Sequence, residues 1–116
     1  MATKNLTKAE FDQLSEAQGI TLVDFWADWC GPCHRFAPVY ERVSERHPDI
    51  TFAKVDTEAE QELTIQFGIS SIPTIMAIRD GVIVFQQAGA LPEQVLENLI
   101  EQVRGLNMDE VRASAS

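Results

Sequence analysis

Apolar residues in the first half of the chain follow two spacings, and each spacing predicts one kind of element. Ile20 to Trp26 is apolar almost without alternation, which is typical of a strand buried on both faces. A helix should follow as far as about Arg46, bent at Pro38 because proline cannot donate a backbone hydrogen bond. Its apolar side chains recur with the spacing of one helix face: Phe36, Val39, Tyr40 and Val43.

Capping and turn residues divide the rest of the chain. Thr7 to Glu10 has the capping-box pattern of a helix start, and Gly19 should end that helix. Asp80-Gly81 is typical of a two-residue hairpin turn. The remaining predicted elements are a faint edge strand in Ala2 to Asn5, a strand from Ile50 to Asp56, a helix from Thr57 or Glu58 to Phe67, strands from Thr74 to Arg79 and from Val82 to Gln87, and a helix from Pro92 to Gly105.

This order of elements predicts one domain of the α/β class, formed by residues 1–105. A parallel pair of strands and an antiparallel hairpin should share one central mixed β-sheet of four to five strands, flanked by four helices on its two faces. Residues 106–116 lack a convincing apolar face, and we expect them to form a mobile tail.

Charge and composition narrow the possible partners. Nine basic and 18 acidic side chains give the 116 residues a net charge of −9, which argues against nucleic acid and anionic membranes. No stretch approaches the roughly 20 apolar residues of a membrane span, and the N-terminal residues lack the hydrophobic core of a signal peptide. We expect a cytoplasmic monomer without a cofactor or metal of its own.

The only two cysteines lie in Trp29-Cys30-Gly31-Pro32-Cys33, between the buried strand and the long helix. Thiols three positions apart can close a small disulfide ring and open it again. The unpaired N–H groups and the positive dipole end of a helix start favour thiolate over thiol. In a reducing compartment such a pair is more often catalytic or metal-binding than a structural crosslink. The motif therefore predicts a dithiol redox centre.

Several separated motifs, taken together, resemble the thioredoxin family from about Leu6 to Gly105. They are Val23-Asp24-Phe25-Trp26-Ala27-Asp28 before the cysteines, then Ala53-Lys54-Val55-Asp56, Ile72-Pro73-Thr74 and Ala88-Gly89-Ala90-Leu91. The resemblance implies the thioredoxin fold and a protein-disulfide reductase that maintains cell redox homeostasis. It also implies disulfide-containing client proteins and an NADPH-dependent, flavin-containing thioredoxin reductase as partners.

The resemblance further implies a division of labour between the thiols. Cys30, at the exposed helix tip, would attack a client disulfide and form a mixed disulfide. Cys33, one turn inward and shielded, would then attack the Cys30 sulfur and release the reduced client.

Asp24 is a carboxylate in the middle of an apolar strand, which is costly unless it is paired or protonated. It could be an edge residue, or it could pair with Lys54 on the neighbouring strand. The functional interpretation is that Asp24 accepts the proton of Cys33, with or without an intervening water, while Lys54 tunes its pKa.

A flat contact patch for clients should surround the cysteines, formed by Trp29, Gly31, Pro32, Ile72 and Gly89. The resemblance implies a cis bond before Pro73, facing the cysteines, although most X–Pro bonds are trans. Ile72 could then offer its backbone N–H and C=O to an extended substrate. The alternative for Trp29 is core packing.

His34 stands where thioredoxins usually have Lys or Arg. It could be an exposed residue without a role, or its charge could make the redox poise depend on pH near neutrality.

Three rival functions remain open at this point. Cys30 to His34 also spells the C-x-x-C-H pattern of haem attachment. Zinc would need Cys30, Cys33, His34 and His47 to converge. A thioredoxin-fold binding or chaperone module could carry an incidental redox centre.

Overall fold

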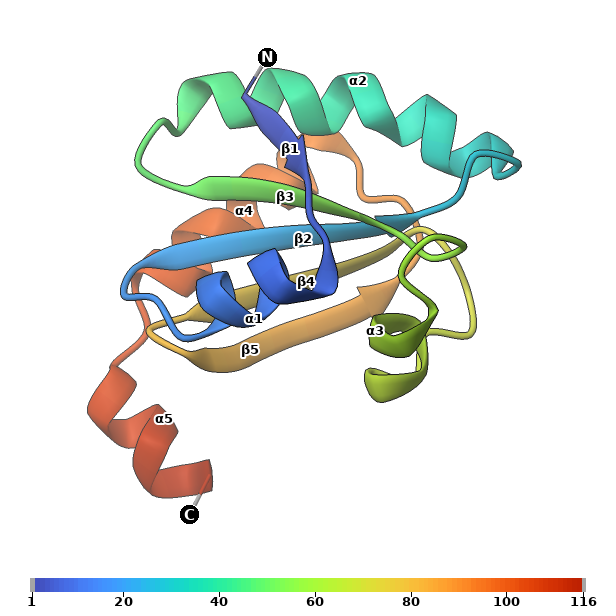
Figure 1. Ribbon diagram of the computed structural model, residues 1–116. Coiled ribbons are helices and arrows are strands. Elements are labelled where there is room, and N and C mark those ends of the chain that lie inside the picture. Colours follow the sequence, from blue (N-terminus) through green and yellow to red (C-terminus); the bar gives the residue numbers. More distant parts are fainter. Residues whose placement is uncertain (1, 116) are drawn as a thin grey trace.

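A five-stranded mixed sheet forms the centre of the protein, as the computed structural model of residues 2–115 shows (Figure 1). The strands lie in the order β1-β3-β2-β4-β5. The first three are parallel, β4 pairs antiparallel with β2, and β5 pairs antiparallel with β4. Their bounds are β1 Thr3–Asn5, β2 Ile20–Trp26, β3 Thr51–Asp56, β4 Thr74–Arg79 and β5 Val82–Ala88. The mixed sheet, including the faint edge strand, confirms the predicted α/β fold.

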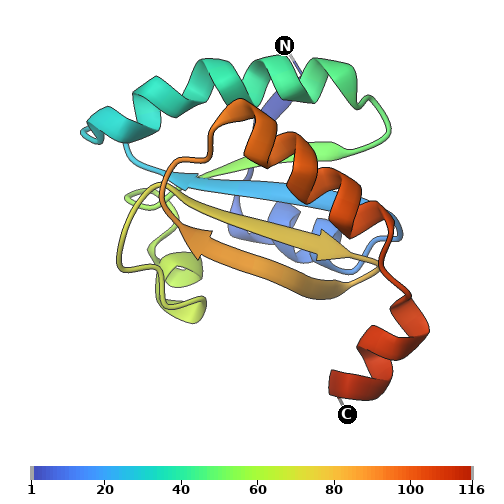
Figure 2. The same ribbon diagram turned by 180° about the vertical axis from the view of Figure 1, so that it is seen from behind.

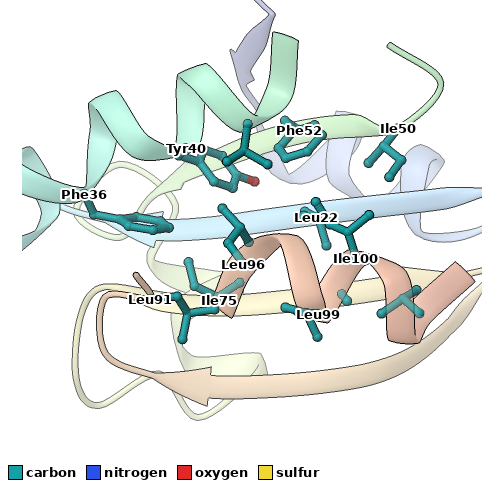
Figure 3. Packing of buried hydrophobic residues seen from close by; sticks show 13 residues of the cluster. Leu22, Phe36, Tyr40, Ile50, Phe52, Ile75, Leu91, Leu96, Leu99 and Ile100 are labelled. Atoms are coloured by element: carbon teal, nitrogen blue, oxygen red, sulfur yellow. The ribbon is translucent and has the colours of Figure 1, made fainter. Parts of the chain in front are cut away.

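Helices cover both faces of this sheet (Figure 2). They are α1 Lys8–Ser15, α2 Gly31–Arg46, α3 Gln61–Gln66, α4 Glu93–Arg104 and α5 Met108–Ala115. The larger apolar core lies between the sheet and helices α2 and α4, where Tyr40, Leu96 and Ile100 pack on Leu22 and Phe52 (Figure 3). A second core lies beneath α1 and α3 on the opposite face. Burial on both faces explains why β2 reads as an uninterrupted apolar run.

Local side-chain bonds set two helix starts. Thr7 and Glu10 form the predicted capping box of α1, although the helix ends at Ser15, before Gly19. The predicted start of α3 at Thr57 or Glu58 is wrong, because the Asp56 carboxylate accepts the backbone N–H groups of Glu58 and Ala59 and holds this segment in a turn. The hairpin turn is as predicted: Asp80 and Gly81 both have positive φ angles, 52° and 83°.

A fifth helix follows α4, where the sequence predicted four helices and a tail. The Asn107 side chain accepts the backbone N–H groups of Asp109 and Glu110 and so caps the start of α5. Met108 is buried, and the rest of α5 extends away from the sheet (Figure 2). Asn107 is a capping residue that the sequence shows, but the weak apolar face of the residues after it led to the prediction of a tail. The mobility of residues 106–116 remains a prediction.

Arg79 joins the end of β4 to the junction between α4 and α5. Its Nη1 lies 2.7, 3.0 and 2.8 Å from the carbonyl oxygens of Val103, Arg104 and Leu106. All three carbonyls lie at or just beyond the end of α4, where helical hydrogen bonding stops; the Val103 carbonyl also accepts the backbone N–H of Leu106 at 3.4 Å. A guanidinium group is suited to this position because it carries both a donor and a positive charge at the negative end of the helix dipole.

We expect Arg79→Met to lower the free energy of unfolding by about 1.5–3 kcal/mol, because three partly buried carbonyls lose a charged donor. Urea denaturation measures this loss. Arg42→Met is the matched control, since Arg42 pairs with Glu93 on the exposed surface and should cost less than about 1 kcal/mol. Equal losses for the two variants would contradict the capping role of Arg79.

Candidate active site

Cys30 and Cys33 form a disulfide at the start of α2, directly after the end of β2. Cys30 is the N-cap residue of the helix, and Pro32 occupies the first turn, where no backbone N–H is needed. The two Cα atoms lie 5.3 Å apart. The spacing of the motif therefore places both sulfur atoms at the positive end of the helix dipole.

The two sulfur atoms differ in their bonding. The backbone N–H of Cys33 donates to Cys30 Sγ at 3.2 Å, so the helix start offers a hydrogen bond to Cys30. The expected contrast in exposure is wrong for the disulfide form, because both cysteines are only 3% exposed. Cys30 packs with Ala27 and Ile72, which cover its sulfur. In the disulfide form the two sulfur atoms therefore differ in hydrogen bonding and not in exposure.

Asp24 lies in β2, the central strand of the sheet, and is completely buried. Neither carboxylate oxygen has a hydrogen-bond partner among residues 2–115. Burial raises the pKa of Asp24 to about 7, and the positive charge of Lys54 lowers it in part. Asp24 is therefore no edge residue. A carboxyl group with this pKa can take up or release a proton near neutral pH.

Lys54 is the register partner of Asp24 on β3. Its ammonium group lies over the Trp26 ring, 4.7 Å from the ring centroid, in a cation–π contact. Within the described part of the chain, no ion pair joins Lys54 to Asp24. The alternative of a simple Asp24–Lys54 pair is therefore wrong, and Lys54 acts on Asp24 through its field alone.

The loop before β4 brings a second backbone segment to the cysteines. The Ile72–Pro73 bond is cis, as expected. Cys30 Sγ lies 3.8 Å from the carbonyl oxygen of Ile72. The backbone N–H of Gly89 donates to the carbonyl of Pro73 at 2.7 Å, and Gly89 has a φ of 107°, which favours glycine. Ile72, Pro73 and Gly89 therefore lie together beside the disulfide.

Trp29 is 71% exposed, so the alternative of core packing is wrong. Its indole N–H donates to Glu58 Oε1 at 2.9 Å, which orients the ring on the surface. Gly31 and Pro32 are exposed beside it. Glu58 was not predicted as a site residue. It follows β3 at the same end of the sheet as the cysteines, and this position could have indicated it.

His34 contacts the loop that carries Trp29. Its Nε2 lies 2.6 Å from the carbonyl oxygen of Asp28, so this nitrogen carries a hydrogen and donates. The ring also stands edge-on to Trp26, with 6.4 Å between the centroids. His34 thus bridges the first turn of α2 and the preceding loop.

The geometry opposes the rival zinc site. His47 follows the far end of α2, a helix of 16 residues and so about 24 Å long, and donates to Glu97 there. It cannot reach the cysteines, so the four ligands that this zinc site would need do not converge.

Comparison with known proteins gives the family. The sequence model of the thioredoxin family matches residues 2–102. The chain belongs to the thioredoxin family. A protein assigned as thioredoxin 2 in Streptomyces coelicolor is 55% identical over 115 residues, 99% of this chain and 86% of that protein. Thioredoxin from Alicyclobacillus acidocaldarius is 45% identical over 103 residues, 88% of this chain and 98% of the relative.

Solved thioredoxin structures have the same fold. Plasmodium falciparum thioredoxin superposes with a TM-score of 0.79 at 38% identity, over 85% of this chain and 97% of the other. A mutant thioredoxin from Halobacterium salinarum gives a TM-score of 0.79 at 34% identity, over 90% of this chain and 94% of the other. Together with the Cys30–Cys33 disulfide, family membership makes the protein a thiol–disulfide oxidoreductase, with disulfide-containing substrates and a reductase partner.

The raised pKa of Asp24 predicts how stability depends on pH. Its folded-state pKa of about 7 exceeds the ordinary value of 3.8, so the folded protein holds this proton more tightly than the unfolded chain. The stabilisation that this proton gives the folded state is therefore complete below about pH 3.8. It is lost as the pH rises through 7, by about 4 kcal/mol in all. We expect Asp24→Asn to stabilise the oxidised protein by roughly 2–4 kcal/mol at pH 8, as measured by urea denaturation.

Asp28→Asn is the matched control for this experiment, because the Asp28 side chain is 95% exposed and should give the parental pH dependence. A clear loss of stability in Asp24→Asn at pH 8 would contradict the burial cost.

Because His34 lies in the first turn of α2 beside the cysteines, we expect its charge to affect their reduction potential. An ordinary histidine changes its charge between about pH 6 and 7.5, whereas lysine stays positive throughout this range. We expect His34→Lys to flatten the reduction potential plotted against pH over this interval, measured by equilibration with glutathione. His47→Gln, at the far end of α2, should leave the curve unchanged. Superimposable curves for His34→Lys and the parent would favour a surface residue without a role.

Proposed function

We propose that the protein is a general protein-disulfide reductase in which Cys30 is the nucleophile and Cys33 the resolving thiol. The observation that carries this assignment is the hydrogen bond from the Cys33 N–H to Cys30 Sγ. In the reduced protein this donor and the helix dipole stabilise the Cys30 thiolate. Cys33, whose sulfur has no such donor among the described residues, stays protonated until the mixed disulfide has formed.

The exchange proceeds in two steps. Cys30 thiolate attacks one sulfur of a client disulfide, forms a mixed disulfide and expels the first client thiolate. Cys33 then loses its proton to the Asp24 carboxylate and attacks Cys30 Sγ, which expels the second client thiolate and leaves the Cys30–Cys33 disulfide. The client gains two electrons, and the protein loses two. Asp24 suits the proton transfer because its pKa of about 7 lies near the working pH.

The surface around the cysteines is the proposed client-binding patch. It consists of Trp29, Gly31, Pro32, Ile72, Pro73 and Gly89. The glycines leave room for a client backbone, and Ile72 can pair with an extended client segment through its own backbone. Glu58 holds the Trp29 ring in the orientation that this patch requires.

The proposed reductant is an NADPH-dependent thioredoxin reductase, and the proposed site of action is the cytoplasm, where thiols are kept reduced. We propose that the protein acts there as a monomer. No helix within residues 2–115 has the length and apolar character needed to cross a membrane. Insulin reduction coupled to NADPH oxidation by such a reductase tests the whole cycle. Suppression of insulin aggregation without NADPH consumption would instead favour the binding or chaperone module.

The division of labour between the thiols predicts which variant traps clients. In Cys33→Ser the nucleophile remains but the mixed disulfide cannot be resolved, so clients should accumulate as covalent complexes. Cys30→Ser lacks the nucleophile and should trap at least about tenfold less. Non-reducing gels of cell extract passed over both immobilised variants provide the comparison. Equal trapping by both variants, or trapping mainly by Cys30→Ser, would contradict the assignment.

A further inference from the structure

Tyr40 places a second buried polar group beneath α2, near the cysteines. Its side chain descends from α2 toward β3, beside Phe52 (Figure 3). The residue is completely buried, and its hydroxyl donates to the carbonyl oxygen of Ala53 at 2.9 Å. The only hydroxyl proton is therefore used, while the oxygen keeps lone pairs that can still accept a hydrogen bond.

The backbone of β3 directs this hydroxyl toward Asp24. Leu6 on the β1 side donates to the carbonyl of Lys54, so that carbonyl faces β1. Carbonyls alternate in direction along a strand, and the carbonyl of Ala53 therefore faces β2. Its register partner there is Val23, the residue before Asp24. Tyr40 thus contacts β3 one register position away from Asp24.

The side chains of Tyr40 and Asp24 also share one face of the sheet. Leu22 packs in the same core as Tyr40, whereas Val23 and Phe25 belong to the core on the opposite face. Side chains alternate along β2, so the carboxyl group of Asp24 points to the same face as Leu22. The charge of Asp24 also raises the pKa of the Tyr40 hydroxyl, second to burial, which places the two groups within electrostatic range.

Few other polar groups face this compartment. Among the described residues, β3 contributes Lys54, and α2 contributes the buried Ser44 in addition to Tyr40. The side chains that β4 and α4 contribute are apolar: Ile75, Leu96 and Ile100. The Tyr40 oxygen is therefore one of few acceptors on this face, where Lys54 is the one charged group that acts on Asp24.

We propose that Tyr40 is a positioning residue for the proton on Asp24: its hydroxyl oxygen, oriented by the Ala53 carbonyl, stabilises the protonated carboxyl group through one water. The proposal deepens the proposed function, because it rests on Asp24 as the proton acceptor of Cys33. Once Asp24 has taken that proton, the acid must hold it until the client thiolate has left. An acceptor that cannot itself donate favours the protonated form over the carboxylate.

The titration of Asp24 tests this role, followed by the ¹³C chemical shift of its carboxyl carbon in the oxidised protein. In Tyr40→Phe the pKa of Asp24 should fall by about 0.5–1 unit, because the acid form loses an acceptor worth a typical neutral hydrogen bond. Tyr40 is the only tyrosine in the chain, so biosynthetic labelling with difluorotyrosine alters this hydroxyl alone. The hydroxyl oxygen of the fluorinated ring is a weaker acceptor, and a smaller fall in the same direction is expected while the hydroxyl group stays in the side chain.

Two variants calibrate the experiment. Lys54→Met should raise the pKa of Asp24, since it removes the one positive charge that lowers it. Phe52→Leu disturbs the same aromatic cluster without removing a polar atom. It should therefore lower the free energy of unfolding but leave the pKa of Asp24 unchanged.

Each outcome decides the proposal. A pKa of Asp24 that is unchanged in Tyr40→Phe and in the fluorinated protein would overturn it. A rise would also overturn it, because it would show that Tyr40 donates its proton to the carboxylate. The proposed function fails separately: unchanged exchange rates in Asp24→Asn would remove Asp24 from the reaction, whatever the titration in Tyr40→Phe shows.

Discussion

The hydrogen bond from the Cys33 amide to the Cys30 sulfur depends on how α2 begins, and the proposed assignment of Cys30 as the nucleophile depends on that bond. The end of β2 places Cys30 at the N-cap, and Pro32 occupies a position where a missing N–H costs nothing. The packing of Phe36, Tyr40 and Val43 against the sheet then fixes the axis of α2. A helix that is packed along its apolar side therefore holds both sulfur atoms in a fixed position at its first turn.

The buried carboxyl group of Asp24 opposes stability in the same place. An unpaired carboxylate in the central strand is unfavourable, which is why its pKa rises to about 7. Leu22 and Phe25, which flank it in β2, are completely buried in the two cores and compensate for this cost. The fold thus tolerates a local loss of stability at neutral pH at the position of the proposed proton acceptor.

Local signals made much of the fold predictable. The Asp80-Gly81 turn, the Thr7–Glu10 capping box and the apolar run of β2 each depend on neighbours in sequence, and each was predicted correctly. The cysteine motif likewise carries its own helix start. The turn at residues 57–60 and the cap at Asn107 are also local, but side-chain bonds to the backbone there outweighed the apolar pattern.

The parts of the site that could not be predicted from the sequence depend on contacts between distant residues. Glu58 meets Trp29, and Tyr40 meets Ala53, only after β3 has paired with β2. The same pairing sets Lys54 beside Asp24, yet it does not reveal that Lys54 lies over the Trp26 ring. Because this contact holds the ammonium group without an ion pair, Asp24 is left with a field that lowers its pKa only in part. The availability of a proton acceptor near neutral pH therefore follows from where the lysine rests, which a pattern of residue types does not encode.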